Sequence, residues 1–566
     1  MDFRKKIRFG DALVQSGAIT EEQLEKALQA QKGTGRKLGE TLVDEGIVTE
    51  DVIAKALSVQ LGLDTVDIQN VSISEDIIKL VPVNVLTKYV MLPFEYSPDN
   101  MNVIRVAMAN PLDMMAMDDI TVITSLQVEP VVATTRSIML AIDKYCGNSD
   151  IDEALAEYAK EKELQMEEQD AVYDNDDVNS SPIVIMVSKM IDLAVRQRAS
   201  DIHIEPTEKS VRVRYRIDGT LYLRDQRPIS LLPAIVARIK IIGGMDISEK
   251  RKPQDGRITQ IVDRQEYDIR VSVLPTVYGE KVVMRLTSKN ALTKDKRQLG
   301  LKPEALKKFD HILSNPHGIL LVTGPTGSGK STTLYTALSE LNSTEVNIIT
   351  VEDPVEANID GINQVHVNPK ANLTFASALR SILRQDPDII MIGEIRDGET
   401  AGIAVQASIT GHLVVSTLHT NSAASTITRL ADMGIEPYLI ADATVGVIAQ
   451  RLVRRLCPHC KEAHKPTNEE RELLGLKPED DTTIYVPHMG GCPACDGMGF
   501  KGRIGVYEIM EMTQPLKRII SRGGDAEEIK EQALKEGMLT LRMSATELVL
   551  EGTTSVSEMV KVSFDL

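Results

Sequence analysis

The chain has 566 residues, which is too long for one hydrophobic core and corresponds to about four domains of about 150 residues each. A net charge of −18 and an isoelectric point near 5.1 argue against broad nucleic-acid binding, which needs clustered lysine and arginine. The basic N-terminus is followed by no apolar signal region, and apolar runs of about 18 residues are absent, so we expect a cytoplasmic protein without a transmembrane segment.

The first region contains a tandem repeat, residues 8–31 and 37–60, with a constant offset of 29 residues. Each copy predicts a short helix, a glycine turn and a second helix, which is capped by Thr20 or Thr49 with acidic residues behind it. Packing between the helices explains why leucines recur in both copies. It does not explain why each copy starts with a basic residue two positions before a glycine and ends with a glutamine. The repeated positions are Arg8, Phe9, Gly10, Leu13, Gly17 and Gln31, and then Lys37, Leu38, Gly39, Leu42, Gly46 and Gln60.

These positions resemble the paired motif of the cyclic-di-GMP-binding N-terminal domain found on some type IV pilus and type II secretion ATPases. The resemblance implies that the motif starts hold the guanines and phosphates, while the leucines support them. Lys37 stands where that family usually has arginine, which weakens bidentate recognition at this position. Two interpretations stay open: a cyclic-di-GMP site, and a purely structural pair of helical hairpins.

The chain from residue 61 to residue 146 is predicted to be a small α/β region. Apolar alternation predicts strands over 102–108 and 127–132, and a helix is expected over 135–145. Residues 147–181 are strongly acidic, which predicts a flexible linker. We therefore expect residues 1–146 to form a regulatory or docking domain that is tethered to the rest of the chain.

Residues 182–292 are predicted to form the next domain, a helix followed by strands. The alternation from Val211 to Ile217 predicts a half-buried strand with arginines on one face. Further strands are expected over 266–274 and 281–286, and they carry Arg270 and Arg285. The pattern alone leaves open whether these two arginines face solvent or a site.

The segment Gly324 to Ser331 fits G-x-x-x-x-G-K-[ST] at every fixed position and follows an apolar run, which predicts a strand, a phosphate loop and a helix. In such a loop the backbone N–H groups surround the β-phosphate, the lysine reaches the β- and γ-phosphates, and the serine hydroxyl binds Mg²⁺. The predicted ATP-binding residues are Gly324, Pro325, Thr326, Gly327, Ser328, Gly329, Lys330, Ser331 and Thr332.

Three apolar strands after the phosphate loop end near Glu352, Glu394 and His419. Alternating strands and helices favour a parallel sheet covered on both faces, with active groups at the carboxyl ends of the strands. Glu394 is the best placed base or water-orienting residue. Glu352 is a second candidate, for orienting water or for holding Mg²⁺ through water.

Two C-x-x-C pairs lie in an insert over about 456–503, and they supply Cys457, Cys460, Cys492 and Cys495. Four thiolates at this spacing can meet at one tetrahedral ion, for which zinc is the expected metal, in a structural site. Free thiols and a redox pair are the alternatives.

From about Ser181 onward the chain resembles the type II/type IV secretion ATPases, hexameric motors that drive pilus or pseudopilus assembly. The resemblance rests on the phosphate loop, the acidic Glu352-Asp-Pro motif, and the segments from Arg384 to Asp397 and from Thr410 to Asn421. It implies an α/β protein in which a RecA-like P-loop ATPase domain, residues 293–566, follows a PAS-like domain, residues 182–292. The cysteine insert and the long N-terminal region favour an assembly motor over a retraction motor.

The resemblance also implies roles for single residues. Glu394 matches the catalytic glutamate, one arginine pair closes over the γ-phosphate, a second pair lies near the site, and two histidines sense the nucleotide state. The implied catalytic set is Glu394, Glu352, Arg270, Arg285, Arg380, Arg384, His412 and His419.

The function implied is ATP hydrolysis by a homohexamer that drives pilin polymerisation through an inner-membrane platform protein, to which the ATPase is peripherally attached. The expected ligands are ATP, Mg²⁺ and Zn²⁺, with cyclic-di-GMP as a regulator. The alternative is a type II secretion ATPase that drives a pseudopilus and shares every motor motif. A nucleic-acid translocase is disfavoured by the acidity and by only 4% aromatic residues, and a receptor with a degenerate ATPase is disfavoured by intact Lys330, Ser331 and Glu394.

Overall fold

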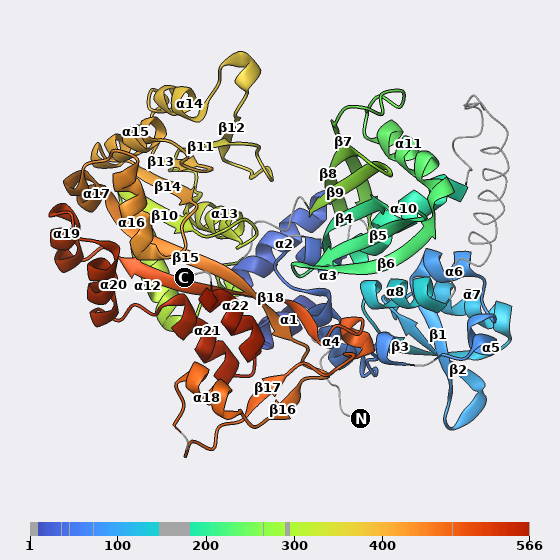
Figure 1. Cartoon of the computed structure of the whole chain (residues 1–566). Coiled ribbons are helices and arrows are strands. Elements are labelled where there is room, and N and C mark those ends of the chain that lie inside the picture. Colours follow the sequence, from blue (N-terminus) through green and yellow to red (C-terminus); the bar gives the residue numbers. More distant parts are fainter. Residues whose placement is uncertain are drawn as a thin grey trace. The chain divides into compact units, whose positions relative to one another are not determined.

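The computed structural model describes residues 9–34, 37–44, 46–71, 73–145, 182–263, 265–288, 295–477 and 479–564 (Figure 1). The chain divides into two compact units, Met1–Asn290 and Ala291–Leu566. The acidic segment predicted as a linker, residues 147–181, lies outside the described residues. Among the described residues, no helix is long and apolar enough to cross a membrane.

The tandem repeat folds as predicted, into two matching pairs of helices. Both glycine turns have the same geometry: Gly17 and Gly46 adopt left-handed φ angles of 71° and 69°. Thr20 caps its helix by accepting a hydrogen bond from the Gln23 N–H, whereas Thr49 makes no side-chain cap, so the predicted capping holds for one copy only. The helices are α1 (Phe9–Gln15), α2 (Glu21–Thr34), α3 (Leu38–Asp44) and α4 (Glu50–Leu61).

A three-stranded sheet follows the repeat, in the order β1-β2-β3. The predicted helix over 135–145 and both predicted strands are present, but β1 was not predicted, because its run Met91-Leu-Pro-Phe does not alternate. The elements are a 3-10 turn (Ile68–Asn70), α5 (Glu75–Ile78), α6 (Val83–Tyr89), β1 (Met91–Ser97), β2 (Asn100–Met108), α7 (Met114–Thr124), β3 (Gln127–Val132) and α8 (Thr135–Tyr145).

The second part of the first unit is a six-stranded sheet in the order β6-β5-β4-β9-β8-β7, with every strand pair antiparallel. Apolar side chains on alternate positions of β5 are buried, as the period-two pattern predicted. The elements are α10 (Pro182–Arg196), β4 (Ala199–Pro206), β5 (Ser210–Ile217), β6 (Thr220–Pro228), a 3-10 turn (Ile229–Leu231), α11 (Leu232–Ile242), β7 (Gln254–Val262), β8 (Gln265–Thr276) and β9 (Gly279–Ser288).

The second unit is built on a seven-stranded sheet in the order β12-β11-β13-β14-β10-β15-β18. All neighbouring strands are parallel except the last pair, β15 and β18. The strands are β10 (Gly318–Thr323), β11 (Ile348–Glu352), β12 (Asn363–His366), β13 (Ile389–Ile392), β14 (Leu413–Leu418), β15 (Thr444–Leu456) and β18 (Phe500–Glu511). The parallel arrangement brings the carboxyl ends of β10, β11, β13 and β14 to one edge.

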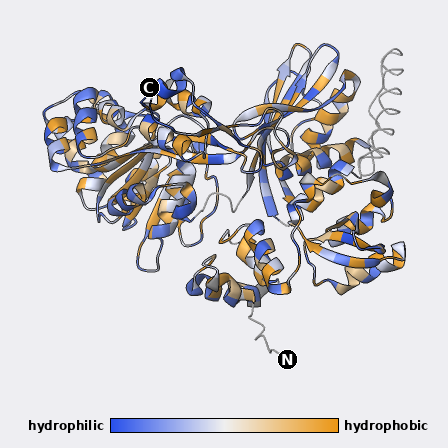
Figure 2. Ribbon diagram, turned by 90° about the horizontal axis from the view of Figure 1, so that it is seen from below, coloured by the Kyte–Doolittle hydropathy of each residue, from blue (hydrophilic) through white to orange (hydrophobic). Residues whose placement is uncertain are grey.

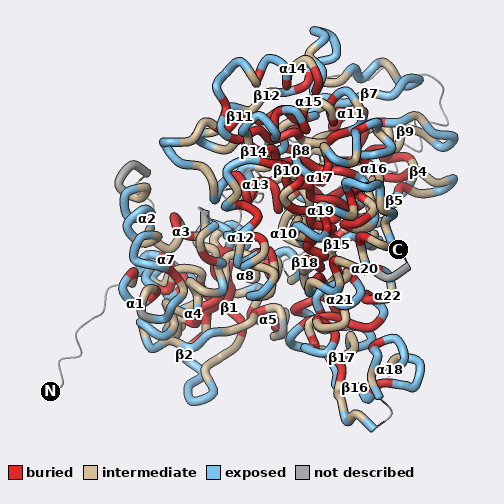
Figure 3. The backbone as a smooth tube through the Cα atoms, turned by 90° about the vertical axis from the view of Figure 1, so that its left-hand side faces the viewer, coloured by how far each residue is buried: buried red, intermediate tan, exposed pale blue. Residues whose placement is uncertain are grey.

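Helices cover both faces of this sheet, which buries its central strands (Figure 3). Along β10, Ile319 and Leu321 pack with the core of α14–α17, whereas Leu320 and Val322 pack with α12 and α13. Hydrophilic and hydrophobic residues alternate along the helices, as expected of helices with one buried face (Figure 2). The helices are α12 (Pro303–Leu313), α13 (Lys330–Leu341), α14 (Phe375–Ile382), α15 (Gly398–Ile409), α16 (Ala423–Asp432) and α17 (Pro437–Ala443), with 3-10 turns Lys296–Leu299 and Pro369–Ala371.

The cysteine insert and the C-terminal helices complete the unit. The insert connects β15 to β18, and the predicted helical tail is present after β18. The insert contains β16 (Glu462–His464), α18 (Asn468–Leu474), β17 (Ile484–Val486) and the 3-10 turn Pro493–Cys495, and the tail contains α19 (Gln514–Ser521), α20 (Ala526–Lys535), α21 (Leu541–Leu550) and α22 (Val556–Phe564).

Candidate active site

The phosphate loop joins β10, which is buried along its whole length, to the start of α13 at Lys330. Gly324 and Gly329 have φ angles of 148° and 90°, and a Cβ at Gly324 would lie 2.5 Å from the backbone oxygen of Gln450. A residue other than glycine would therefore clash there. The Lys330 ammonium donates to the backbone oxygens of Gly324 (2.7 Å) and Pro325 (3.1 Å), and burial lowers its pKa to about 8.

Two residues of β15 lie behind the loop, and sequence analysis did not identify them. Gln450 accepts a hydrogen bond from Thr333 on α13 (2.8 Å), and a Cβ at Gly329 would lie 2.8 Å from its amide nitrogen. Arg451 donates to the Asn421 side chain (3.1 Å) and lies beside Gly324. Both side chains are buried, which is unusual for glutamine and arginine. The only signal in the sequence was the presence of these two polar residues inside an apolar strand.

Glu394 follows β13 by two residues and lies at the carboxyl edge of the sheet. Its carboxylate accepts a hydrogen bond from Arg396 and lies 3.5 Å from the imidazole Nε2 of His419. Burial favours the protonated acid, but the Arg396 hydrogen bond and charge, with the charges of His419 and Lys330, hold the pKa of Glu394 below its ordinary value. Glu394 is therefore a carboxylate at neutral pH, as a proton acceptor must be.

Arg396 links this carboxylate to the acidic motif after β11. One Nη donates to Glu394, and the other lies 3.5 Å from Asp353. Arg396 lies within the segment from Arg384 to Asp397 but was not among the predicted site residues. The signal was its spacing, because a residue two positions after Glu394 returns to the same side of an extended chain.

Glu352 occupies a different environment from the one its prediction assumed. It is 3% exposed at the end of β11, and its oxygens accept hydrogen bonds from Tyr335, Thr350 (2.6 Å) and Gln364 (3.1 Å). These three donors are neutral and come from α13, β11 and β12. These hydrogen bonds join the three elements beneath the site. The role of Glu352 in orienting water or holding Mg²⁺ stays a prediction.

Ser331 donates a hydrogen bond from its hydroxyl to Glu356 (3.2 Å). Hydroxyl and carboxylate oxygens are the ligands that Mg²⁺ prefers, so this pair fits a magnesium position next to the loop. Glu356 was not predicted, because it lies four residues beyond the end of its strand, within a loop.

The two histidines of the segment 410–421 lie at opposite ends of β14. His419 follows the carboxyl end and approaches Glu394, whereas His412 precedes the amino end, where its Nδ1 contacts the Ala407 backbone oxygen (2.9 Å). The six residues of β14 lie between them, and seven steps at about 3.3 Å per residue separate the two by about 23 Å. His412 therefore lies away from Glu394 on this sheet, and its role as a nucleotide-state sensor stays a prediction.

Arg380 and Arg384 lie on and just after α14. Arg380 pairs with Glu399 (2.5 Å) in the first turn of α15, the helix that starts directly after the Glu394 segment. Arg384 donates to the Arg380 backbone oxygen (2.8 Å). Arg380 is thus held beside the start of α15 by an acid, and Arg384 is held against α14 by a backbone contact.

Arg270 and Arg285 belong to the first unit and are direct cross-strand partners on β8 and β9. Arg285 pairs with Asp201 through Nε (3.1 Å), and Arg270 Nε lies 3.8 Å from Asp268. Paired residues of antiparallel strands share one face, so the two guanidiniums form one cationic site.

The four predicted cysteines meet in one cluster, with all four sulfurs within 4.8 Å of one another. The pairs Cys457–Cys492, Cys460–Cys495 and Cys492–Cys495 each have an Sγ–Sγ distance of 3.8 Å. Four sulfurs about 2.3 Å from a tetrahedral zinc ion would lie about 3.8 Å apart. Burial raises the pKa of Cys460 and Cys492, whereas hydrogen bonds from the Cys492 and Gly499 N–H groups lower the pKa of Cys495.

The repeat residues divide into a buried and an accessible set. Leu13 and Leu42 are fully buried at equivalent places, and Gly10 and Gly39 pack against Leu38 and Phe9 of the other copy. Lys37 and Gln60 are exposed, and Arg8 lies outside the described residues. The copies therefore interlock through their glycines, while part of the polar set stays accessible.

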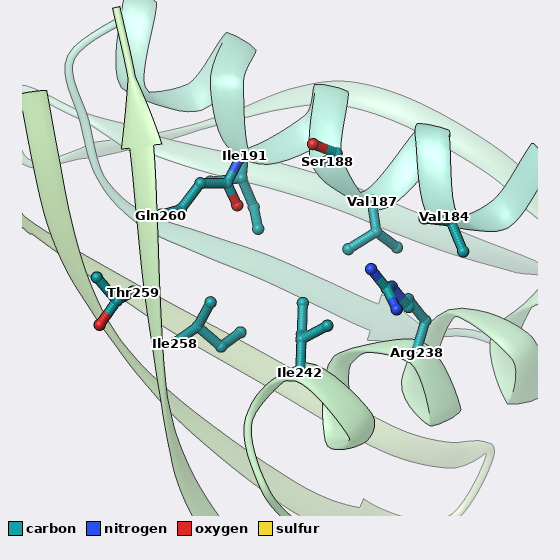
Figure 4. Close-up of a pocket in the computed structure, with 9 residues that line it drawn as sticks. All are labelled: Val184, Val187, Ser188, Ile191, Arg238, Ile242, Ile258, Thr259 and Gln260. Carbon is teal, nitrogen blue, oxygen red and sulfur yellow. The ribbon is translucent and has the colours of Figure 1, made fainter. Parts of the chain in front are cut away.

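A cavity of about 290 Å³ lies in the first unit between α10, α11 and β7 (Figure 4). Its walls are mainly apolar, with Val187, Ile191 and Ile242, and Arg238 enters it from α11. It contains none of the predicted site residues, and its lining has no phosphate loop or acidic cluster. The candidate active site is therefore the open carboxyl edge around Lys330 and Glu394, not this cavity.

Comparison with known proteins gives matches over most of the chain. Residues 176–561 match the family model "Type II/IV secretion system protein", and residues 61–160 match an "MshEN domain" model. The chain is 43% identical to the type IV pilus assembly ATPase PilB of Myxococcus xanthus, over 98% of each chain. It is 48% identical to the type II secretion system ATPase E of Vibrio cholerae, over 68% of this chain and 76% of that protein. The crystal structure of the Legionella pneumophila ATPase DotB, 21% identical, covers 68% of this chain and 96% of its own with a TM-score of 0.51, a likeness of fold.

Proposed function

The chain belongs to the type II/IV secretion system protein family, and from that premise we propose that it is an ATPase whose hydrolysis of ATP powers type IV pilus assembly. The observation that carries the proposal is the joint placement of Lys330 and Glu394 at one sheet edge. The pilus assignment is supported by an alignment with the Myxococcus relative that runs over nearly the whole of both chains. The type II secretion ATPase is the second candidate, because its relatives share the ATPase part of the chain.

In the proposed reaction, Glu394 accepts a proton from the water that attacks the γ-phosphorus, and the bond to the ADP oxygen breaks. Lys330 and the loop N–H groups hold the β- and γ-phosphates. Mg²⁺, when bound, neutralises phosphate charge, and Ser331 and Glu356 are its proposed protein ligands. His419, which contacts Glu394, is the proposed sensor of the nucleotide state.

Arg270 and Arg285 are proposed to bind the γ-phosphate when the domain that carries them closes over the ATPase domain. Two guanidiniums that neutralise charge in the transition state act as arginine fingers do. Arg380 and Arg384 are a proposed second pair. In a homohexamer, closure on ATP binding and release after hydrolysis would move an inner-membrane platform protein, to which the ATPase attaches peripherally from the cytoplasm.

We further propose the domain division 1–146, 147–181, 182–292 and 293–566, with zinc in the four-cysteine insert. The sulfur spacing supports zinc, and a closed Cys₄ site is structural. Such a site would fix the connected end of the β15–β18 strand pair, whose strand β15 carries Gln450 and Arg451 behind the phosphate loop. Cyclic-di-GMP is the proposed regulator at the repeat, supported by the matching helix pairs and the accessible Lys37.

Deletion of the gene separates the pilus and pseudopilus functions. We expect loss of surface pili by electron microscopy, with normal amounts of exported proteins in the medium. A strain that keeps its pili but retains those proteins in the periplasm would assign the chain to type II secretion instead. Complementation with Lys330→Ala, which removes the phosphate-binding charge, should fail in either case.

A further inference from the structure

One register position of the six-stranded sheet carries a charged residue on five consecutive strands. From β5 to β7 the row reads Arg216, Asp201, Arg285, Arg270 and Arg257. Directly paired residues of antiparallel strands lie on the same face, with Cβ atoms about 5 Å apart. The row therefore places three arginines side by side, with a fourth beyond the aspartate.

Like charges directly opposite each other destabilise a sheet, so the row needs compensation. Asp201 supplies it at one end: its oxygens lie 3.1 Å from Arg285 Nε and 3.6 Å from Arg216 Nε. Asp268 supplies it at the other end, two residues before Arg270 and on the same face. Asp268 hydrogen-bonds Arg257 Nε and lies 3.8 Å from Arg270 Nε.

The two aspartates lie beneath the arginines. Their side chains are 9% and 6% exposed for Asp201 and Asp268, whereas the Arg285 side chain is 64% exposed. Asp201 is held in turn by the Ser200 hydroxyl (2.8 Å). Asp201 therefore holds Arg285 by a hydrogen bond at Nε, whereas Asp268 holds Arg257 by a hydrogen bond and Arg270 by an ion pair at Nε. The Nη edge is the part of a guanidinium that can take two phosphate oxygens.

We propose that Asp201 and Asp268 are positioning residues that pre-orient Arg285 and Arg270 for the γ-phosphate of ATP. The proposal rests on the proposed function of these two arginines. An arginine side chain that is already ordered loses less rotamer freedom when it binds phosphate. A larger part of its interaction energy with phosphate is then left to stabilise the transition state. Without the aspartates, repulsion between the neighbouring arginines would also push their guanidinium groups apart.

The test is ATP turnover by full-length Asp201→Asn and Asp268→Asn, which keep side-chain size but remove charge. We expect kcat to fall about 10- to 100-fold, the usual effect of removing a partner that orients a functional group. ADP lacks the γ-phosphate, so its dissociation constant should stay at the wild-type value. The matched control is Glu205→Gln, a buried carboxylate on the same strand and face that holds Arg214 and Lys281.

A double-mutant cycle separates positioning from a general loss of structure. Asp201→Asn should add no further loss to Arg285→Ala, because both changes remove the same guanidinium from use. If Asp201→Asn keeps wild-type kcat while Arg285→Ala loses it, the positioning proposal is overturned and the arginine assignment stands. Equal losses in Glu205→Gln and Asp201→Asn would also overturn it. If Arg270→Ala and Arg285→Ala both turn over ATP normally, the proposed function of the arginines itself fails.

Discussion

Arg396 donates a hydrogen bond to Glu394, the proposed base, and lies 3.5 Å from Asp353 with its other nitrogen. This arginine keeps the pKa of Glu394 below its ordinary value against the effect of burial. The charge and the position of the Glu394 carboxylate therefore depend on Arg396.

Replacing Arg396 by glutamine should therefore move the acid limb of the kcat/KM profile to higher pH. The pKa of Glu394 rises when Arg396 no longer favours the carboxylate, so the base is protonated over a wider acidic range. At neutral pH we expect about a 10-fold lower kcat from the lost orientation. Rates of phosphate release, measured from pH 5 to 8 over a range of ATP concentrations, give both kcat and kcat/KM. An unchanged acid limb would show that Arg396 does not set the pKa of Glu394. The control is Arg522→Gln, which breaks an exposed ion pair with Glu528.

Nucleotide binding should weaken in alkaline solution because of Lys330. Its pKa is lowered by burial to about 8 without nucleotide, and the phosphates must raise it on binding. Affinity is therefore full below pH 8 and falls as pH rises, by up to about 10-fold per pH unit until the pKa of the bound state is reached. Fluorescence titration with an ATP analogue at pH 7.0 to 9.5 tests this. Lys330→Arg keeps its charge throughout, so its affinity should stay flat, and a flat wild-type curve would contradict the assignment.

Much of this site was predictable because its residues have fixed spacing along the chain. Lys330 and Ser331 follow from the loop pattern, and Glu394 follows from its place after an apolar strand. Glu352 follows the same rule yet points into a buried network with Tyr335 and Gln364, because which way a strand-end side chain faces depends on its neighbours. Arg451 and the row of Arg257 and Arg270 depend on strand order and register, which no local pattern specifies.

Removing one thiolate should destabilise the second unit through the cysteine insert. We expect Cys492→Ser to lose bound zinc and to lower the free energy of unfolding by about 2–5 kcal/mol, as loss of a native cross-link does. Atomic absorption and calorimetry measure the two quantities. His488→Gln, whose imidazole contacts Glu462, should keep one zinc per chain. If wild-type protein without zinc unfolds with the same free energy as wild-type protein with zinc, a structural zinc is ruled out.

Cyclic-di-GMP binding should depend on the accessible basic residue of the second repeat. Lys37→Ala should weaken binding about 10-fold in calorimetry on the full chain, since it loses a charged hydrogen bond to phosphate. Lys37→Arg should bind at least as tightly, because guanidinium contacts phosphate bidentately. Lys26→Ala, which breaks an exposed pair with Glu22, is the control. No binding by the wild-type chain at micromolar ligand would leave the repeat a structural module.

The most direct test of the account is ATP turnover by Glu394→Gln in the full-length protein. The amide keeps the shape of the side chain and the phosphate loop is untouched, so ATP should bind with wild-type affinity. Without a proton acceptor, kcat should fall by about 100- to 10,000-fold. Wild-type hydrolysis by Glu394→Gln would contradict the central claim that this carboxylate activates water.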